Sequence, residues 1–219
     1  MKKFLIVILL ISAPLMAQVK PDPDFNTIMF CPTPQTLPAG SQYFKDFELF
    51  FLNYGFSLSD NTTISIGTHF PVTGGLAFVT AGFKQRIFNR DTHPLGLAVF
   101  ANGTFYDDGS FGMIGLIAGI GDNDSSLNLA LSQGYKEHAN SEIFVMVGAD
   151  RRVGGGTKLI AEYLNAHEFL DLYDDEFYGF GNFGIKWFGE TMAVSLTGLM
   201  PLSSSTLFAF PMVSISKHW

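Results

Sequence analysis

Residues 126–136 read Ser-Leu-Asn-Leu-Ala-Leu-Ser-Gln-Gly-Tyr-Lys. Leu127, Leu129, Leu131 and Tyr135 fall on one face of an extended chain, and small or polar residues fall on the other. A period of two residues is typical of a strand whose two faces differ, because successive side chains of a strand point to opposite sides. The segment therefore predicts an amphipathic β-strand.

The same alternation recurs along the chain, and we find no segment with the spacing of an amphipathic helix. Short clusters of Asp, Asn, Gly and Ser separate the alternating segments. Connectors this short allow only antiparallel neighbours, because a parallel crossover needs a dozen or more residues. From residue 42 onward the sequence predicts eleven strands: 42–58, 62–72, 76–89, 95–106, 111–121, 126–137, 142–152, 157–165, 177–187, 192–202 and 206–219.

An open sheet of this size would expose long edges, and closure into a barrel removes them. Bacterial membrane barrels have an even number of strands, so we expect a twelfth strand at 25–31. A barrel of ten strands is the alternative. With twelve strands the longest connector, 166–176, lies at the outer end, where longer loops are expected. The predicted fold is an all-β, antiparallel, up-and-down transmembrane β-barrel.

The N-terminus is typical of a bacterial export signal. Two lysines precede an unbroken apolar run at 4–11, and small residues suited to cleavage follow at 13–17. The apolar run is too short to cross a bilayer as a helix. We therefore expect a cleaved signal peptide at 1–17, an N-terminal Pro-rich segment at 18–41 and the barrel at 42–219. The Pro-rich segment holds the possible first strand and is also a candidate to fold into the lumen.

Composition narrows the class of protein. Of the 219 residues 47% are hydrophobic and only 15% are charged, with a formal net charge of −7. A disordered chain would be poorer in aromatic and apolar residues, and a nucleic-acid-binding protein would be basic. The single cysteine, Cys31, excludes an internal disulfide. The five histidines lie outside the known contexts of hydrolase nucleophiles, and the acidic segment 166–176 lacks calcium-loop spacing. We expect no enzymatic activity, no metal and no cofactor.

The charged residues indicate which face of the strands meets lipid. Ten of them are assigned to the face opposite the aliphatic side chains. In a dry barrel core they would be costly, whereas a wet lumen tolerates them. They would either bias a narrow pore or form ion pairs that plug it. The predicted lumen-lining residues are Asp46, Glu48, Lys84, Arg86, Lys136, Asp150, Arg152, Lys158, Glu162 and Lys186.

The chain ends with an aromatic residue preceded by apolar residues at alternate positions, Val213, Ile215 and Trp219. This ending resembles the C-terminal signal that the outer-membrane barrel assembly machinery recognises. The resemblance implies that this machinery is a partner during biogenesis.

Several turn motifs carry a further resemblance. Residues 31–40 read Cys-Pro-Thr-Pro-Gln-Thr-Leu-Pro-Ala-Gly, residues 53–61 read Asn-Tyr-Gly-Phe-Ser-Leu-Ser-Asp-Asn, and residues 64–67 read Ile-Ser-Ile-Gly. With Glu162, Asn165, a Gly-Ile-Lys strand at 184–186 and Pro211, they resemble a family of small uncharacterised bacterial outer-membrane β-barrel proteins. The resemblance implies the fold and the location, and it implies no activity.

These observations together predict an integral protein of the bacterial outer membrane, in contact with lipid and lipopolysaccharide. We expect a non-enzymatic narrow passive channel or a structural or surface protein, without a nucleic-acid partner and of open oligomeric state. The alternatives are a lipid-modifying outer-membrane enzyme and a soluble periplasmic β-barrel that binds a ligand.

Overall fold

The computed structural model describes residues 21–48, 50–69, 78–106, 109–136, 141–165, 177–203 and 208–219. The predicted signal peptide and the predicted long connector 166–176 lie outside these residues. In the described part of the chain no helix is long and apolar enough to cross a membrane.

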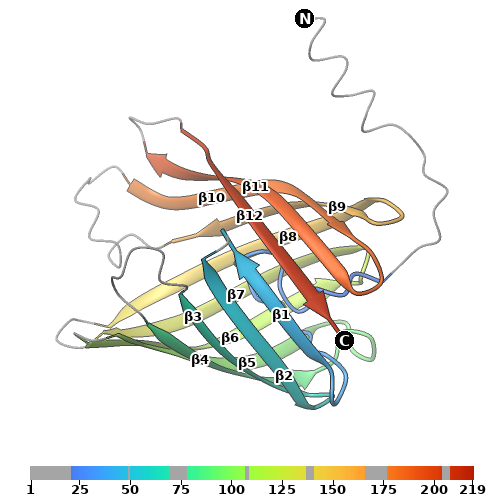
Figure 1. The fold of residues 1–219 in the computed structure, drawn as a ribbon, viewed down its shortest axis with the longest axis horizontal. Coiled ribbons are helices and arrows are strands. Elements are labelled where there is room, and N and C mark those ends of the chain that lie inside the picture. Colours follow the sequence, from blue (N-terminus) through green and yellow to red (C-terminus); the bar gives the residue numbers. More distant parts are fainter. Residues whose placement is uncertain are drawn as a thin grey trace, which may run out of the picture.

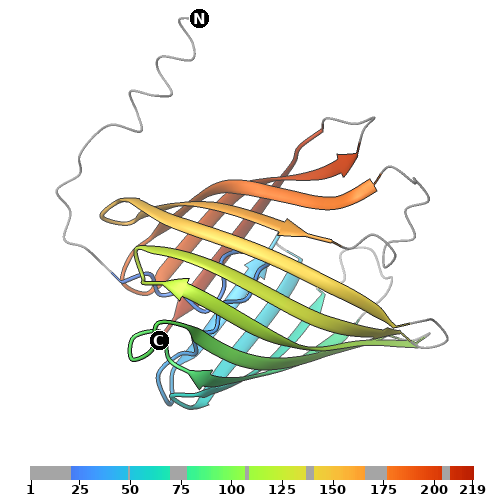
Figure 2. The same ribbon diagram turned by 180° about the vertical axis from the view of Figure 1, so that it is seen from behind.

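Twelve antiparallel strands form one closed barrel (Figures 1 and 2). Each strand pairs with its neighbours in sequence, and the first strand pairs with the last. This is the predicted up-and-down order, and the predicted strand count is confirmed. The strands are β1 (Gln42–Phe47), β2 (Phe51–Ser59), β3 (Thr62–His69), β4 (Val79–Phe88), β5 (Gly96–Tyr106), β6 (Gly109–Gly121), β7 (Ser125–Lys136), β8 (Glu142–Gly154), β9 (Thr157–Leu164), β10 (Phe177–Phe188), β11 (Met192–Ser203) and β12 (Phe210–His218).

The position predicted for the twelfth strand is wrong. Residues 25–31 contribute only one isolated bridge, between Thr27 and Pro32, and no strand of the barrel wall. The extra strand comes instead from the predicted strand 42–58, which is divided into β1 and β2. The chain reverses at Glu48, whose φ of 58° lies in the left-handed region. The sequence there, Phe-Glu-Leu-Phe, contains none of the Gly, Pro or Asn residues that usually mark a turn.

The two ends of the barrel differ in their connectors. The turns between β2 and β3, β6 and β7, β8 and β9, and β10 and β11 are two or three residues long. They lie at the end where β1 begins and β12 finishes, which we name the short-turn end (Figure 1). The connectors 70–78 and 165–176 leave from the opposite, long-loop end. Exchanging one predicted strand for another keeps this parity, so β9 ends and β10 begins at the long-loop end, away from the end where β12 finishes. That the long-loop end is the outer end stays a prediction.

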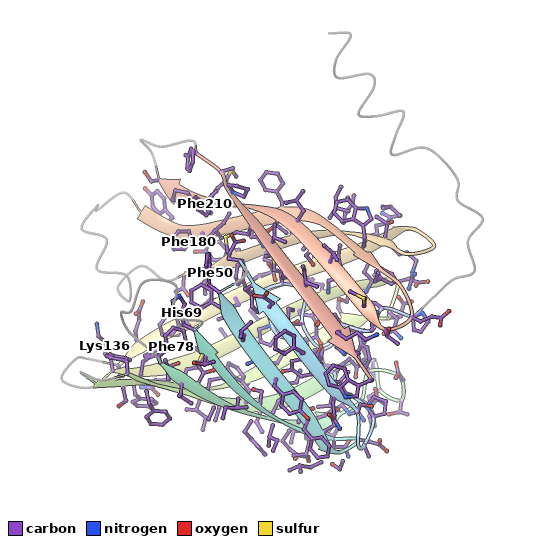
Figure 3. The ribbon with its side chains drawn as sticks, in the orientation of Figure 1. Phe50, His69, Phe78, Lys136, Phe180 and Phe210 are labelled. Carbon is purple, nitrogen blue, oxygen red and sulfur yellow. The ribbon has the colours of Figure 1, made fainter. Side chains whose placement is uncertain are left out.

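The outer face of the wall is apolar. On β7, Leu127, Leu129 and Leu131 are 49%, 40% and 45% exposed, whereas Asn128 and Ala130 on the other face are 0% and 1% exposed. Large apolar side chains project outward in the same way around the barrel (Figure 3). An apolar exterior around a polar interior is the arrangement of a transmembrane barrel, in which closure pairs every backbone group of the wall.

The C-terminal strand closes the barrel against β1. Val213 and Ile215 alternate with the buried Ser214 and Ser216, so the two apolar residues of the predicted insertion signal lie on the outer face. The backbone N–H of Trp219 donates to the carbonyl of Gln42 at 3.1 Å, and its indole Nε1 donates to the Gln42 side chain at 3.0 Å.

The difference between the two faces of the wall predicts the effect of a charge at Ala161. Ala161 pairs with Phe183 on the outer face of β10. We expect Ala161→Arg to lower the free energy of unfolding in lipid vesicles by about 2–4 kcal/mol, because it places a charge against acyl chains. Urea unfolding followed by tryptophan fluorescence measures the change.

Thr157→Arg is the control for depth in the membrane. Thr157 lies on the same face of β9, beside the turn and opposite Trp187. We expect Thr157→Arg to lower the free energy of unfolding by only about 0–1 kcal/mol, because a charge near the interface stays hydrated. Equal costs at the two positions would mean that this face does not meet lipid.

Candidate functional site: a lumen closed from within

The N-terminal segment lies inside the barrel, at the short-turn end (Figures 1 and 2). We name residues 22–37 the plug, because nearly all of them are buried or half-buried within the wall. Ile28, Met29 and Cys31 are each 1% exposed. The plug doubles back on itself through a hydrogen bond from the Thr33 N–H to the Asn26 carbonyl at 3.1 Å. The sequence left two locations open for the Pro-rich segment, a first strand of the wall or the lumen. The plug residues of this segment lie in the lumen.

Ion pairs join the plug to the wall. The Asp22 carboxylate lies 3.0 Å from the Lys158 ammonium and 3.7 Å from that of Lys186. The Asp24 carboxylate lies 3.0 Å from Lys45 and 3.4 Å from Lys186. All five side chains are no more than 4% exposed. Removing one partner of such a buried pair is costly, because the other charge is left without compensation.

Asp24 is the centre of this cluster. Burial opposes its ionisation, but the ammonium groups of Lys45 and Lys186 outweigh burial and hold the pKa of Asp24 below its ordinary range. His218 of β12 lies 3.7 Å from the same carboxylate. The plug therefore carries a negative charge that three strands of the wall, β1, β10 and β12, surround with potential cations.

A second link involves the plug backbone. The Glu162 Oε1 atom accepts hydrogen bonds from the backbone N–H groups of Met29, Phe30 and Cys31 at 2.9, 2.9 and 2.8 Å. Asn182 donates to the other carboxylate oxygen at 2.6 Å. Successive N–H groups that converge in this way form an anion-binding nest, so one wall carboxylate fixes the central turn of the plug.

Glycines on the wall make room for the plug. A Cβ atom at Gly148 would lie 2.7 Å from the Cys31 Cβ and 2.7 Å from the Ile28 Cδ1. A Cβ atom at Gly119 would lie 2.9 Å from the Pro34 Cδ. Any other residue at these positions would force the plug or the wall to move.

Most of the predicted lumen charges contact the plug or the rim of the barrel. Lys158, Lys186 and Glu162 are buried against the plug, Asp150 pairs with Lys158 at 2.6 Å, and Lys84 donates to the plug carbonyls of Asn26 and Thr33 at 3.0 and 3.3 Å. At the short-turn rim Arg86 donates to Asn61 and Gln35, and Arg152 pairs with Asp124 at 2.6 Å. Lys136 is exposed at the long-loop end (Figure 3).

Two of the predicted residues do not line the lumen. The register places Asp46 between Leu52 and Ile215 on the outer face, and Lys45 holds the lumen position instead. Glu48 lies in the turn after β1, where its carboxylate accepts a hydrogen bond from the backbone N–H of Val213. Glu48 was misplaced because 42–58 was treated as one continuous strand and the reversal at Glu48 was not expected. Asp46 has the same parity as Leu52 and Tyr54 on the outer face, so its placement in the lumen was a wrong face assignment that the turn does not explain.

Sequence reasoning also missed Asp22 and Asp24. They belong to a segment without periodicity, and two of their lysine partners, Lys158 and Lys186, are more than a hundred positions away. A signal was nevertheless present, because the ten predicted lumen residues hold six bases and four acids, and an enclosed lumen needs that excess positive charge compensated.

Above the plug, toward the long-loop end, the lumen is hollow. Two cavities of about 360 and 300 Å³ share wall residues Asn53, Ser65, Gly82 and Asn102. The first reaches down to the plug at Asn26, Thr27 and Met29, so plug residues form its floor. The lumen thus consists of an occupied half and a vestibule, and these features define a transmembrane barrel with an internal plug.

Two solved structures resemble this barrel. The KdgM porin in complex with disordered oligogalacturonate matches with a TM-score of 0.59 and 8% sequence identity, over 82% of this chain and 96% of that chain. The KdgM porin matches with a TM-score of 0.58 and 7% identity, over 82% of this chain and 98% of that chain. The likeness is one of fold. No protein-family model and no curated protein sequence matches the chain.

The buried plug makes a prediction about Cys31. Burial, followed by the nearby Glu162 carboxylate, raises the pKa of the Cys31 thiol, so the thiol is both enclosed and protonated. We expect maleimide to label it slowly in the folded protein. Asp24→Asn should speed labelling about a hundredfold or more, because loss of a buried partner costs about 3–5 kcal/mol and each 1.4 kcal/mol is tenfold.

Asp91→Asn is the matched control, since Asp91 is an exposed acid in a turn at the same end. It should leave the labelling rate unchanged. Rapid labelling of the unmodified folded protein, or equal rates for the two variants, would contradict a plug held by ion pairs.

Proposed function

We propose that this chain is an integral, non-enzymatic protein of the bacterial outer membrane that acts as a narrow passive channel. Its lumen is closed at the short-turn end by its own plug, and displacement of the plug opens the path. The observation that carries the proposal is that residues 22–37 form no strand of the wall and are held inside the polar lumen by buried ion pairs with lysines of β1, β9 and β10.

The two faces of the barrel support a membrane location. The apolar exterior suits acyl chains, and the terminal Trp219 suits insertion by the barrel assembly machinery. The fold shared with the KdgM porin supports a channel, since that protein is a porin and the match covers 82% of this chain and 96% of that chain. The soluble-binder alternative would place an apolar exterior against water.

The geometry at the best candidate nucleophile supports a non-enzymatic role. Ser216 and His218 both face the lumen, and Asp24 supplies an acid near His218. Within the described residues, however, the Ser216 hydroxyl and both His218 nitrogens make no hydrogen bond. A serine nucleophile needs a hydrogen bond to its base, and these side chains lie two residues apart on one strand without one.

Conductance in planar lipid bilayers tests the proposal. We expect the unmodified protein to show small and infrequent openings, because the plug fills the short-turn half of the lumen. An Asp22→Asn, Asp24→Asn double variant should show larger and more frequent openings, because Lys45, Lys158 and Lys186 lose plug counter-charges and the plug is released.

Asp91→Asn serves again as the charge control and should conduct like the unmodified protein. Gel mobility with and without heating confirms that each variant is a folded barrel. A folded double variant that never conducts would exclude the channel. Full conductance of the unmodified protein would exclude closure by the plug.

A further inference from the structure

The vestibule above the plug is lined by neutral polar side chains, aromatic rings and methionines, and a row of polar groups crosses β3, β4 and β5. Cross-strand pairs place Ser65, Gly82 and Asn102 in one row on β3, β4 and β5, and Gly67 and Thr80 in the next row. A Cβ atom at Gly82 would lie 2.4 Å from the Ser65 hydroxyl oxygen and 2.7 Å from the Asn102 amide oxygen. Because Gly82 has no side chain, the Ser65 hydroxyl and the Asn102 amide lie close over its backbone, and both groups line the cavity.

The neighbouring row repeats the arrangement. A Cβ atom at Gly67 would lie 2.5 Å from the Thr80 hydroxyl oxygen and 3.1 Å from the Asn53 amide nitrogen. Asn53, Thr80 and Asn102 all line the vestibule. These groups offer donors and acceptors without net charge, which is the chemistry that complements ligand hydroxyl groups.

Aromatic rings border the polar rows. Phe30 of the plug stacks on Phe47 of β1 with ring centroids 6.0 Å apart, and both line the cavity, as does Tyr43. At the long-loop end Phe51, His69 and Phe78 form a cluster with centroids 5.2–6.0 Å apart, and Figure 3 shows His69 and Phe78 there together with Phe50. Ring faces beside neutral hydrogen-bonding groups suit a ligand that has both C–H faces and hydroxyl edges.

Charge narrows the ligand class. Among the described lining residues of the two cavities Lys45 and Lys84 are the only lysine, arginine, histidine or carboxylate side chains. Both ammonium groups bond to the plug, Lys45 to Asp24 and Thr27 and Lys84 to two backbone carbonyls. A ligand entering the vestibule meets no carboxylate there and two lysines already engaged, so a neutral ligand fits better than an anionic one.

From this geometry we infer that the vestibule is a binding site for neutral saccharides, with Asn102 and Asn53 as hydrogen-bonding residues and the cavity beside them as the seat of a sugar ring. The inference rests on the proposed function, since it names the class of solute that the channel would take from the long-loop side. The combined cavities are within the usual range of about 300–1,000 Å³ for ligand sites.

Isothermal titration calorimetry of the detergent-solubilised full chain tests the inference, with maltotriose as the neutral probe and trigalacturonate as the acidic one. We expect maltotriose to bind with little dependence on salt and trigalacturonate to bind at least about tenfold more weakly. Asn102→Leu should weaken maltotriose binding about tenfold, as expected when two or so hydrogen bonds are lost from a buried site.

Gly82→Ala tests the polar row without removing a hydrogen-bonding group, because its Cβ would lie 2.4 Å from the Ser65 hydroxyl and 2.7 Å from the Asn102 amide oxygen and would displace both side chains. We expect the same loss of about tenfold, since the displaced Asn102 amide no longer meets the ligand in the same place. Gly103→Ala is the matched control, since the adjacent Gly103 faces outward and its Cβ would make only ordinary contacts with Phe105. It should bind maltotriose like the unmodified protein.

Absence of maltotriose binding to the folded unmodified protein, tighter and salt-dependent binding of trigalacturonate, or equal binding by all three variants would each overturn the inference. Binding is measured in detergent and with the plug in place, so its failure is separate from a failure to conduct. If the Asp22→Asn, Asp24→Asn variant conducts while the unmodified protein binds no saccharide, the result supports the proposed channel and excludes the saccharide site.

Discussion

The buried ion pairs of Asp22 and Asp24 with lysines of the wall are the interaction on which the rest of this structure depends. Lys45, Lys158 and Lys186 project into a lumen sealed from lipid by twelve strands, and at the short-turn end they are almost completely shielded from water. Their charges need partners, and Asp150 supplies only one. The plug brings the other two, so it is part of the electrostatic balance of the barrel interior.

The wall is also shaped to accommodate the plug. Glycines at 119 and 148 leave space where Pro34 and Cys31 approach, and Glu162 binds three successive backbone N–H groups that a turn inside a barrel would otherwise leave unpaired. Where the plug ends, the wall changes from paired charges to neutral amides and hydroxyls. The two halves of the lumen therefore suit different tasks, closure at one end and solute contact at the other.

Much of this architecture could be predicted from the sequence, because strand pairing and the orientation of each face depend on local alternation. Leu127 to Lys136 was assigned to its two faces correctly, and so was the apolar exterior. The reversal at Glu48 was missed because the turn lacks Gly, Pro and Asn, and that error placed Glu48 in the lumen. Asp46 was assigned to the wrong face, since the neighbouring Lys45 faces the lumen. The plug contacts could not be predicted in detail, because Asp22 and Asp24 meet partners that only closure of the whole barrel brings near.

The central claim, that residues 22–37 occupy the lumen against β8, is tested most directly by a disulfide. A Cβ atom at Gly148 would lie 2.7 Å from the Cys31 Cβ and 3.0 Å from its Sγ, close enough for a bridge after a small shift. We predict that the Gly148→Cys variant, mildly oxidised as a folded barrel in detergent, forms an intramolecular disulfide between Cys31 and position 148 that peptide mapping detects. The Gly103→Cys variant, altered on the outer face, should form none. A folded Gly148→Cys protein that keeps both thiols free, or that cross-links no better than the Gly103→Cys variant, would contradict the plugged barrel.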